Sequence, residues 1–280
     1  MKKLTKDWYL LRTIYHLSRH IFKSLQNKEP VIVLTIGKAA STSVYHSLSN
    51  QTSYHTFHIH CLSKSGLHRQ IIFHKEHDSG RIPPNVRVAK FFRKNLLNFK
   101  GNLKIIVIVR SPVDRLISAI FQHYERFKLD SFKTEKDKGY FRTLEFIKHK
   151  VEQNDVWNEF DVWFQEEINQ SFGIDVYSKP FDTIKKYNIY KQGNVSLLLV
   201  RMEDLNTVFS NAMNEFLNTS STIALEYHNV GEKKDYRSEY SLIKKNLKIE
   251  REIINKYVQT KFFKYFYSGQ EDELIKKWTI

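Results

Sequence analysis

The chain has 280 residues, of which 41% are hydrophobic and 14% aromatic, and its formal net charge is +15 at pH 7. This composition excludes a disordered chain, and the length suffices for one sizeable core or two small ones. The excess of basic residues indicates an acidic partner, and nucleic acid, anionic lipid and anionic glycan all fit it. No helix-turn-helix, zinc-finger or RNP-like pattern supports nucleic acid.

The cysteine content and the hydropathy of the chain indicate in which cellular compartment the protein is expected. The chain has one cysteine, Cys61, so no disulfide can form within it. No apolar run approaches the length of a membrane span, and the N-terminus lacks the apolar centre and cleavage site of a secretory signal. We therefore expect a cytoplasmic protein.

The first 29 residues predict an amphipathic helix. Trp8, Leu11, Tyr15 and Phe22 recur at helical spacing, with Lys and Arg on the other face. A helix that lies on a membrane surface fits this pattern, and so does a helix packed on the domain. We favour the packed helix and keep peripheral membrane contact as the alternative.

A strand, a short loop and a helix are predicted between residues 31 and 48. The run Val31–Ile36 is wholly apolar, as in a strand buried on both faces, and Val44 and Leu48 follow at helical spacing. The residues between them are Gly37, Lys38, Ala39, Ala40, Ser41, Thr42 and Ser43. Such a junction offers backbone N–H groups, a helix N-terminus, a lysine and three hydroxyls to one anion. It differs from the nucleoside-triphosphate loop GxxxxGK[ST], because Lys38 comes early and the hydroxyls come late.

Histidines are interleaved with the apolar residues of the next predicted strand, which lies within TSYHTFHIHCL. Alternation along a strand places His58 and His60 on the same face. A metal pair is disfavoured, because no cysteine or acidic residue stands at ligand spacing from them. Further along, residues 87–90 predict a short strand, followed by a helix with Phe91 and Phe92 on its buried face.

A second strand–helix junction lies between residues 104 and 124. Ile105–Val109 predicts another buried strand with Arg110 at its carboxyl end. Ser111 and Pro112 suit the start of a helix, and Ser118 lies within its apolar stripe. In an open parallel sheet ligands bind at the carboxyl ends of strands, so Arg110 and Ser118 are predicted to reach a second anion beside the first.

Together the two junctions resemble the PAPS-dependent sulfotransferases, which use 3′-phosphoadenosine 5′-phosphosulfate. The segment GKAASTS is similar to the phosphosulfate loop of heparan-sulfate uronosyl 2-O-sulfotransferases, and R-S-P-x-x-R-x-x-S resembles the family's 3′-phosphate motif. Bacterial sulfotransferase-like proteins of capsular polysaccharide loci carry similar pairs. The resemblance implies that residues 37–43 hold the 5′-phosphosulfate, and that Arg110 and Ser118 hold the 3′-phosphate.

Three departures from the family pattern stand out. Gly37 replaces the usual proline, Ser111 replaces a common aspartate, and Ala40 stands where many members have glycine, which requires the loop to avoid positive φ there. None removes a side chain that the chemistry needs.

Sulfuryl transfer to a hydroxyl needs a base for the acceptor proton and positive charge for the leaving phosphate. Lys38 supplies the charge, and His60, with His58 second, is the expected base. His74, His77 and Glu76 are reserves. In the 2-O-sulfotransferases the catalytic histidine lies shortly before the 3′-phosphate strand, yet residues 80–102 here contain no histidine.

The middle of the chain reads as a charged surface segment and then helix. Residues 127–139 predict a loop or a lid, and residues 144–172 are mostly helical and end at Gly173. An aromatic stripe along this helix is favoured as core over a sugar platform: Trp157, Phe160, Trp163, Phe164 and Ile168. Residues 174–177 predict a short strand.

The last part predicts a buried strand over Val195–Val200, a helix over Leu205–Leu217 and a helical end from Ser241. Arg201, Glu203 and Asp204 resemble a structural segment of sulfotransferases. A polar, basic segment over residues 228–240 carries Lys233, Lys234 and Tyr236. These three either close over the nucleotide, as the resemblance implies, or form a solvated face.

We therefore expect one domain over residues 1–280. It comprises an N-terminal helix (1–29), a nucleotide-binding core (30–210) with a helical insertion (127–172), and a C-terminal helical region (211–280). The fold implied is α/β, a P-loop-type three-layer sandwich with a mostly parallel sheet and helices on both faces.

The expected reaction transfers a sulfuryl group from PAPS to a hydroxyl of a glycan, such as a capsular polysaccharide, and releases PAP without a metal. The basic surface suits an anionic glycan. One rival is a P-loop kinase or NTPase, which would need a Gly-Lys-Ser/Thr order and an acidic Mg²⁺ ligand. The other is a non-catalytic protein of this fold that binds polysaccharide or its assembly machinery.

Overall fold

The structure is a computed structural model, and it describes residues 29–77, 80–96, 101–124, 127, 129–153, 156–228 and 236–279. The predicted N-terminal helix, apart from Glu29, lies outside the described residues, as do Lys233 and Lys234.

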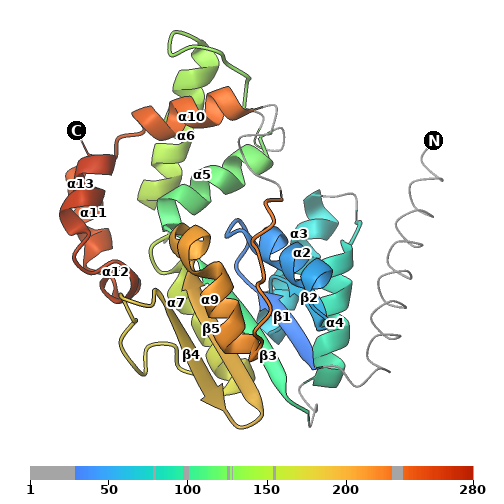
Figure 1. Cartoon of the computed structure of the whole chain (residues 1–280). Coiled ribbons are helices and arrows are strands. Elements are labelled where there is room, and N and C mark those ends of the chain that lie inside the picture. The colour runs from blue at the N-terminus through green and yellow to red at the C-terminus, as the bar shows by residue number, and fades with distance from the viewer. Residues whose placement is uncertain are drawn as a thin grey trace. The chain divides into compact units, whose positions relative to one another are not determined.

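The chain forms two compact units (Figure 1). The first, here the sheet unit, contains the described residues up to Val109, Trp163–Ser178 and Asp182–Glu226. The second, here the helical unit, contains Arg110–Val162, Lys179–Phe181 and the described residues from Tyr227 onward. The expectation of a single domain stays a prediction.

Within the described residues, the sheet unit has a five-stranded sheet in the order β2-β1-β3-β5-β4 (Figure 1). The strands are β1 (Pro30–Leu34), β2 (His55–Ile59), β3 (Leu103–Val109), β4 (Tyr187–Gln192) and β5 (Val195–Arg201). Only β4 runs antiparallel to its neighbour. The apolar runs predicted as buried strands are confirmed, and so is the α/β class with a mostly parallel sheet. Its assignment to a sulfotransferase-type P-loop sandwich stays a prediction.

Helices cover both faces of this sheet. On one face Val33, Ile106 and Leu198 share a register row and pack with residues of α2 (Ser41–Gln51) and α9 (Leu205–Leu217). On the other face Phe57 of β2 meets Phe92 of α4 (Pro84–Leu96), with ring centroids 4.2 Å apart. Successive residues of a strand point to opposite faces of the sheet, so β1 and β3 contribute side chains to the hydrophobic packing on each face.

The strand order reverses at β1, which has β2 on one side and β3 on the other. Crossovers that leave from two such neighbouring strands open a crevice at their carboxyl ends, where open α/β sheets bind ligands. The loop that follows β1 lies at the carboxyl end of that strand, next to the end of β3. The chain also leaves the sheet there, after Val109.

Two local predictions are wrong. Residues 87–90 belong to α4, because Val86, Ala89 and Phe92 are buried at a spacing of three, which suits a helix and not a strand. Residues 174–177 form no strand, and Asp175 instead accepts from the backbone of Tyr177 and Ser178 in a turn.

Two further elements were not predicted from the sequence, α3 (Lys64–His77) and β4. The first has few apolar residues at helical spacing. The second pairs with β5 through a turn at Gly193 and Asn194, and its mixed polar composition hides it.

The residues between Trp163 and Gly173 complete the sheet unit. A π-helix, η2 (Phe164–Asn169), continues α7 (Glu159–Trp163) and leads into α8 (Gln170–Phe172). Gly173 ends the helix with φ at 70°, as predicted. Trp163, Phe164 and Ile168 are buried, which confirms the core interpretation for this part of the stripe.

The helical unit is built on aromatic packing. Its helices are α5 (Pro112–Gln122), α6 (Lys138–Gln153), most of α7, α10 (Arg237–Asn246), α11 (Arg251–Val258), α12 (Lys261–Phe266) and α13 (Glu271–Trp278). Trp157 stacks on Tyr257 at 4.3 Å, and Phe160 stacks on Phe262 at 4.5 Å. The predicted surface segment 127–139 is mostly exposed, but Phe132 is buried beside Tyr140 and anchors it.

Candidate functional site

The loop between β1 and α2 has an unusual backbone. Gly37, Lys38 and Ala40 have φ angles of 86°, 61° and 58°. The expectation that Ala40 avoids positive φ is therefore wrong. A left-handed conformation costs an L-residue about 1–2 kcal/mol, and such strain gathers where a ligand is held. Turns of this kind direct backbone N–H groups into a concavity that suits an anion.

Helix α2 begins directly at the end of this loop. Its first backbone bond joins the Val44 N–H to the Ala40 carbonyl at 3.2 Å. Its N-cap, Ala40, provides no side-chain cap, and its first turn carries no acidic residue. The positive end of the helix dipole is thus not offset by a carboxylate there. Ser41 and Ser43 are buried, and Thr42 is half-buried.

His60 lies against this loop. Its Nδ1 is 2.9 Å from the Thr35 carbonyl oxygen, and an added Cβ on Gly37 would lie 3.8 Å from the His60 ring. A carbonyl oxygen can only accept, so Nδ1 carries the proton of this bond. In the neutral ring Nε2 is then the atom with a free lone pair, as a general base requires.

The surroundings of His60 keep its ring neutral. Burial lowers the pKa of His60, the Thr35 carbonyl opposes this, and the positive charge of Lys38 lowers the pKa further. The effect of Lys38 means that the predicted lysine and the predicted base lie within electrostatic reach of each other. A neutral imidazole at physiological pH is the form that can accept a proton.

His58 has a different environment, although the two rings meet at 4.8 Å on one face as alternation predicted. Its Nε2 is buried and has no hydrogen-bond partner among the described residues. Burial, with the charges of His60 and His46, lowers the pKa of His58 to about 3. His46 of α2, whose ring contacts Tyr45, was not singled out from the sequence.

The reserve residues lie elsewhere on α3. His74 is half-buried beside Phe73, and Glu76 is exposed. The side chain of His77 lies outside the described residues. Among the predicted bases whose side chains are described, His60 is the one that lies against the loop.

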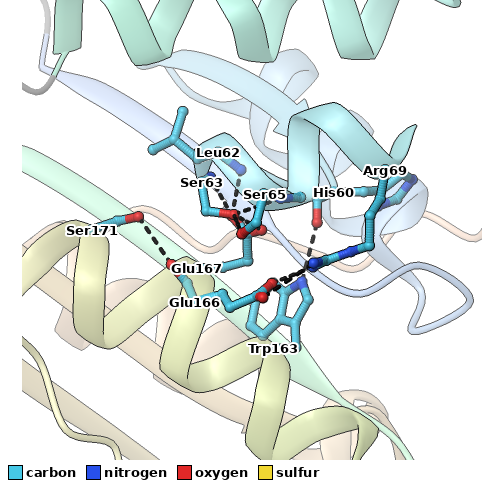
Figure 2. Close-up of polar contacts among 10 residues, drawn as sticks. His60, Leu62, Ser63, Ser65, Arg69, Trp163, Glu166, Glu167 and Ser171 are labelled. Atoms are coloured by element: carbon cyan, nitrogen blue, oxygen red, sulfur yellow. Dashed lines mark hydrogen bonds and ion pairs between the residues drawn. The ribbon is translucent and has the colours of Figure 1, made fainter. Parts of the chain in front are cut away.

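The backbone that follows His60 is held by residues far away in the sequence (Figure 2). Trp163 Nε1 donates to the His60 carbonyl at 3.1 Å. The buried Glu167 carboxylate accepts from the Leu62 N–H at 2.5 Å and from the Ser63 N–H and hydroxyl, both at 2.6 Å. Trp163 was predicted to be a core residue, and no sequence motif singles out Glu167.

A pocket of about 830 Å³ opens beside this segment. Its lining combines three cations with hydroxyl, amide and aliphatic groups: Ser63, Lys64, Ser65, Leu67, His68, Ile71, Lys90, Arg93, Glu166, Gln170 and Ser171. Glu166 is ion-paired with Arg69 (Figure 2), so its charge is offset. The remaining charge of the lining is positive, which suits an anionic ligand.

The second predicted anion motif lies in the helical unit. Arg110 directly follows β3 and donates to the Tyr240 hydroxyl of α10 at 3.3 Å. The Tyr236 ring packs against Phe121 at 5.6 Å, and Ser118 is half-buried in α5. Tyr240 was not singled out from the sequence. The union of Arg110 and Ser118 with the Lys38 loop in one nucleotide site stays a prediction.

The described residues hold no group of three His, Cys, Asp or Glu side chains placed to bind a metal ion. None of the helices in the described ranges combines the length and the hydropathy needed to cross a bilayer.

Comparison with known proteins gives one result. Residues 137–268 match the family model described as "Putative capsular polysaccharide synthesis protein". No curated protein and no solved structure matches the chain. The matched segment includes Trp163 and Glu167 but neither anion motif. The match shows a similarity to that family over these residues and leaves the reaction open.

Proposed function

We propose that this protein is a sulfotransferase that moves a sulfuryl group from PAPS to a hydroxyl of a capsular or cell-surface glycan. The observation that carries the proposal is the anion loop with His60 beside it. Gly37, Lys38 and Ala40 have positive φ angles, α2 begins after them, and His60 lies against Gly37. A phosphosulfate needs this charge and these donors, and an acceptor hydroxyl needs such a base.

Each residue of the loop has a role in this proposal. Lys38, with the N–H groups of the loop and of the first turn of α2, binds the phosphosulfate and stabilises the charge on the departing phosphate. Ser41, Thr42 and Ser43 add hydroxyl donors. When bound, PAPS supplies the sulfuryl group and leaves as PAP. His60 takes the acceptor proton at Nε2 while its Nδ1–H stays on the Thr35 carbonyl.

Arg110 and Ser118 are proposed to hold the 3′-phosphate. Tyr236 packs against Phe121, which also contacts Tyr240, the hydrogen-bond partner of Arg110. Arg110 is suited to this task because its guanidinium binds phosphate through two parallel donors.

The acceptor is proposed to be anionic. The family match supports a polysaccharide, and the net charge of +15 supports an acidic one. The basic pocket with Lys64, Lys90 and Arg93 lies next to the segment that carries His60, and its size is that of ordinary small-ligand pockets.

Calorimetric titration with PAP, beside ADP and ATP and with and without Mg²⁺, tests the proposal. We expect PAP to bind more tightly than ADP and independently of Mg²⁺. Preference for Mg²⁺·ATP would contradict the proposal in favour of a kinase or NTPase. Failure to bind any of the three nucleotides would favour a non-catalytic polysaccharide-binding protein.

Lys38→Ala provides a direct test of the loop. We expect sulfuryl transfer to be lost and PAP affinity to fall by tenfold or more, because a charged hydrogen bond contributes about 1.5–3 kcal/mol. Thermal unfolding should stay near that of the unmodified protein. Lys94→Gln, on the exposed side of α4, is the control for loss of one positive charge. Unchanged transfer by Lys38→Ala would remove the loop from the mechanism.

A further inference from the structure

We infer that Trp163 and Glu167 are positioning residues that hold the backbone of residues 60–63 and so fix the orientation of His60. The inference rests on the proposed function, in which His60 is the base. Neither Trp163 nor Glu167 belongs to one of the two anion motifs.

Glu167 makes the denser set of contacts. Its side chain is 1% exposed, and both carboxylate oxygens are used: Oε2 accepts from the backbone N–H groups of Leu62 and Ser63, and Oε1 accepts from the Ser63 hydroxyl. A carboxylate is costly to bury, so donors of this number and geometry are needed to keep it there. An apolar side chain at this position would hold the two segments together without the desolvation cost of a buried carboxylate.

Trp163 holds the other end of the same segment. Its indole N–H donates to the His60 carbonyl at 3.1 Å, and its ring is buried. Trp163 ends α7, and Glu167 lies in the π-helix that follows. The two side chains therefore reach the 60–63 segment from one stretch of helix (Figure 2). Single π-turns within α-helices are frequent at functional sites.

A plain helix-capping role accounts for only part of this arrangement. Helix α3 already has a side-chain cap, because the Ser63 hydroxyl accepts from the Gly66 N–H at 2.9 Å. Glu167 binds N–H groups that precede the helix, and Trp163 binds a carbonyl three residues before Ser63. The contacts thus constrain the strand end that carries His60, in addition to the helix that follows.

Gly66 shows how closely the two segments approach. A Cβ at position 66 would lie 2.1 Å from Glu167 Oε1. Only glycine leaves room for the carboxylate here, so the sequence of α3 is adapted to the contact.

The His60 ring is then held from two sides. Trp163 and Glu167 hold its backbone, and the Thr35 carbonyl holds Nδ1. A shift of the backbone by a fraction of an ångström would weaken the Nδ1 bond. Without that bond the neutral ring could carry its proton on either nitrogen, and the fraction with a free Nε2 would fall.

The experiment compares Trp163→Phe and Glu167→Gln with Glu215→Gln. The last variant breaks the ion pair between Glu215 of α9 and Lys185, which neither touches residues 60–63 nor lines the pocket. The readouts are the tautomer and titration of His60 by ¹⁵N NMR, the pH profile of kcat for sulfuryl transfer, and the Kd of PAP.

We expect Trp163→Phe and Glu167→Gln to give His60 a mixture of tautomers, to shift the acidic limb of the kcat profile, and to lower kcat tenfold or more. The Kd of PAP should change less than twofold. Glu215→Gln should keep the tautomer and the profile of the unmodified protein. If Glu167→Gln does not fold, Trp163→Phe, which removes one donor, still provides the test.

An unchanged His60 tautomer and pH profile in Trp163→Phe would overturn the inference, whatever its effect on thermal stability. This outcome differs from failure of the proposed function. If PAP did not bind the unmodified protein, the sulfotransferase proposal would fail, whereas the NMR readout of His60 needs no substrate.

Discussion

His58 and His60 are two residues apart, yet their surroundings suit them to different tasks. His60 has a defined partner for Nδ1 in the Thr35 carbonyl and lies against the anion loop. His58 packs between Tyr45 and His60, with a buried Nε2. These surroundings favour His60 over His58 as the proposed base, and burial keeps the His58 ring neutral. This choice depends on the partners of each ring nitrogen, which residue type and alternation do not reveal.

The pH dependence of stability tests the burial of His58. Burial lowers the pKa of His58 to about 3 in the folded protein, below the usual histidine value of about 6.5. As the pH falls, His58 takes up a proton in the unfolded chain before it does so in the folded protein. The free energy of unfolding therefore falls as the pH drops from about 6.5 toward 3. One such proton contributes up to about 1.4 kcal/mol per pH unit.

We expect His58→Gln to reduce this slope in urea unfolding measured between pH 7 and pH 4. His68→Gln, at an exposed position of α3, is the matched control for removal of one histidine. A slope in His58→Gln equal to that of the unmodified protein would show that His58 is not protonated on unfolding in this range.

Among the elements, α5 is the one around which the C-terminal helices gather. Asp114, in its first turn, is ion-paired with Lys244 of α10 at 2.7 Å and with Lys277 of α13 at 2.9 Å. Burial alone would raise the pKa of Asp114, but the charges of Lys277 and Lys244 outweigh it and lower the pKa. Stability from this carboxylate is therefore present above the unfolded pKa of about 3.9 and is lost as the pH falls below it.

Asp114→Asn is expected to lower the free energy of unfolding of the protein by about 1–2 kcal/mol at pH 7, a figure reduced for the exposure of both lysines. The difference from the unmodified protein should be smaller at pH 3 than at pH 7, because the carboxyl begins to take up its proton below the unfolded pKa of about 3.9. Denaturant titration at both pH values measures it. The control, Glu252→Gln, breaks an exposed pair on α11 and should leave stability unchanged. Equal stability of Asp114→Asn at pH 7 would mean that α10 and α13 do not depend on this contact.

The pocket beside α3 and α4 leads to a prediction about the acceptor. The double variant Lys64→Gln, Lys90→Gln should bind a hyaluronan or heparin tetrasaccharide at least fivefold more weakly, because two cations of the lining are lost. Lys94→Gln, on α4 but outside the pocket, should bind as the unmodified protein does.

Calorimetry at 50 mM and 200 mM salt measures this effect, with neutral maltotetraose as the comparison. Equal affinity for the neutral and anionic tetrasaccharides would contradict an anionic acceptor at this pocket.

At the scale of the whole molecule, the two predicted anion motifs fall in two compact units. Lys38 belongs to the sheet unit, and Arg110 begins the helical unit. If one nucleotide engages both, PAP should protect the backbone amides of residues 37–43 and 110–118 from hydrogen exchange together. Protection of only one segment would separate the two motifs.

Arg110→Ala extends this test. We expect it to weaken PAP binding by about 1.5–3 kcal/mol while leaving the affinity for adenosine 5′-phosphosulfate nearly unchanged, because the latter lacks the 3′-phosphate. Calorimetry with both ligands measures the difference. Equal losses for the two ligands would remove Arg110 from the 3′-phosphate site.

Local sequence patterns sufficed to predict the buried strands, the helix over Leu205–Leu217 and the small-residue loop at the end of β1. These features depend on neighbouring residues, since a run of β-branched residues favours a buried strand and a three-to-four spacing favours a helix. The strand interpretation of residues 87–90 failed because four residues are too few to tell the two periods apart.

Three features could not be predicted from the sequence: the left-handed conformation of Ala40, the Thr35 partner of His60, and the contacts of Trp163 and Glu167 with residues 60–63. The first opposes the intrinsic conformational preference of alanine, so the residue type does not indicate it. The others join residues that the chain separates by up to 105 positions. No local pattern records such contacts, because they form only when the folded elements bring their donors and acceptors together.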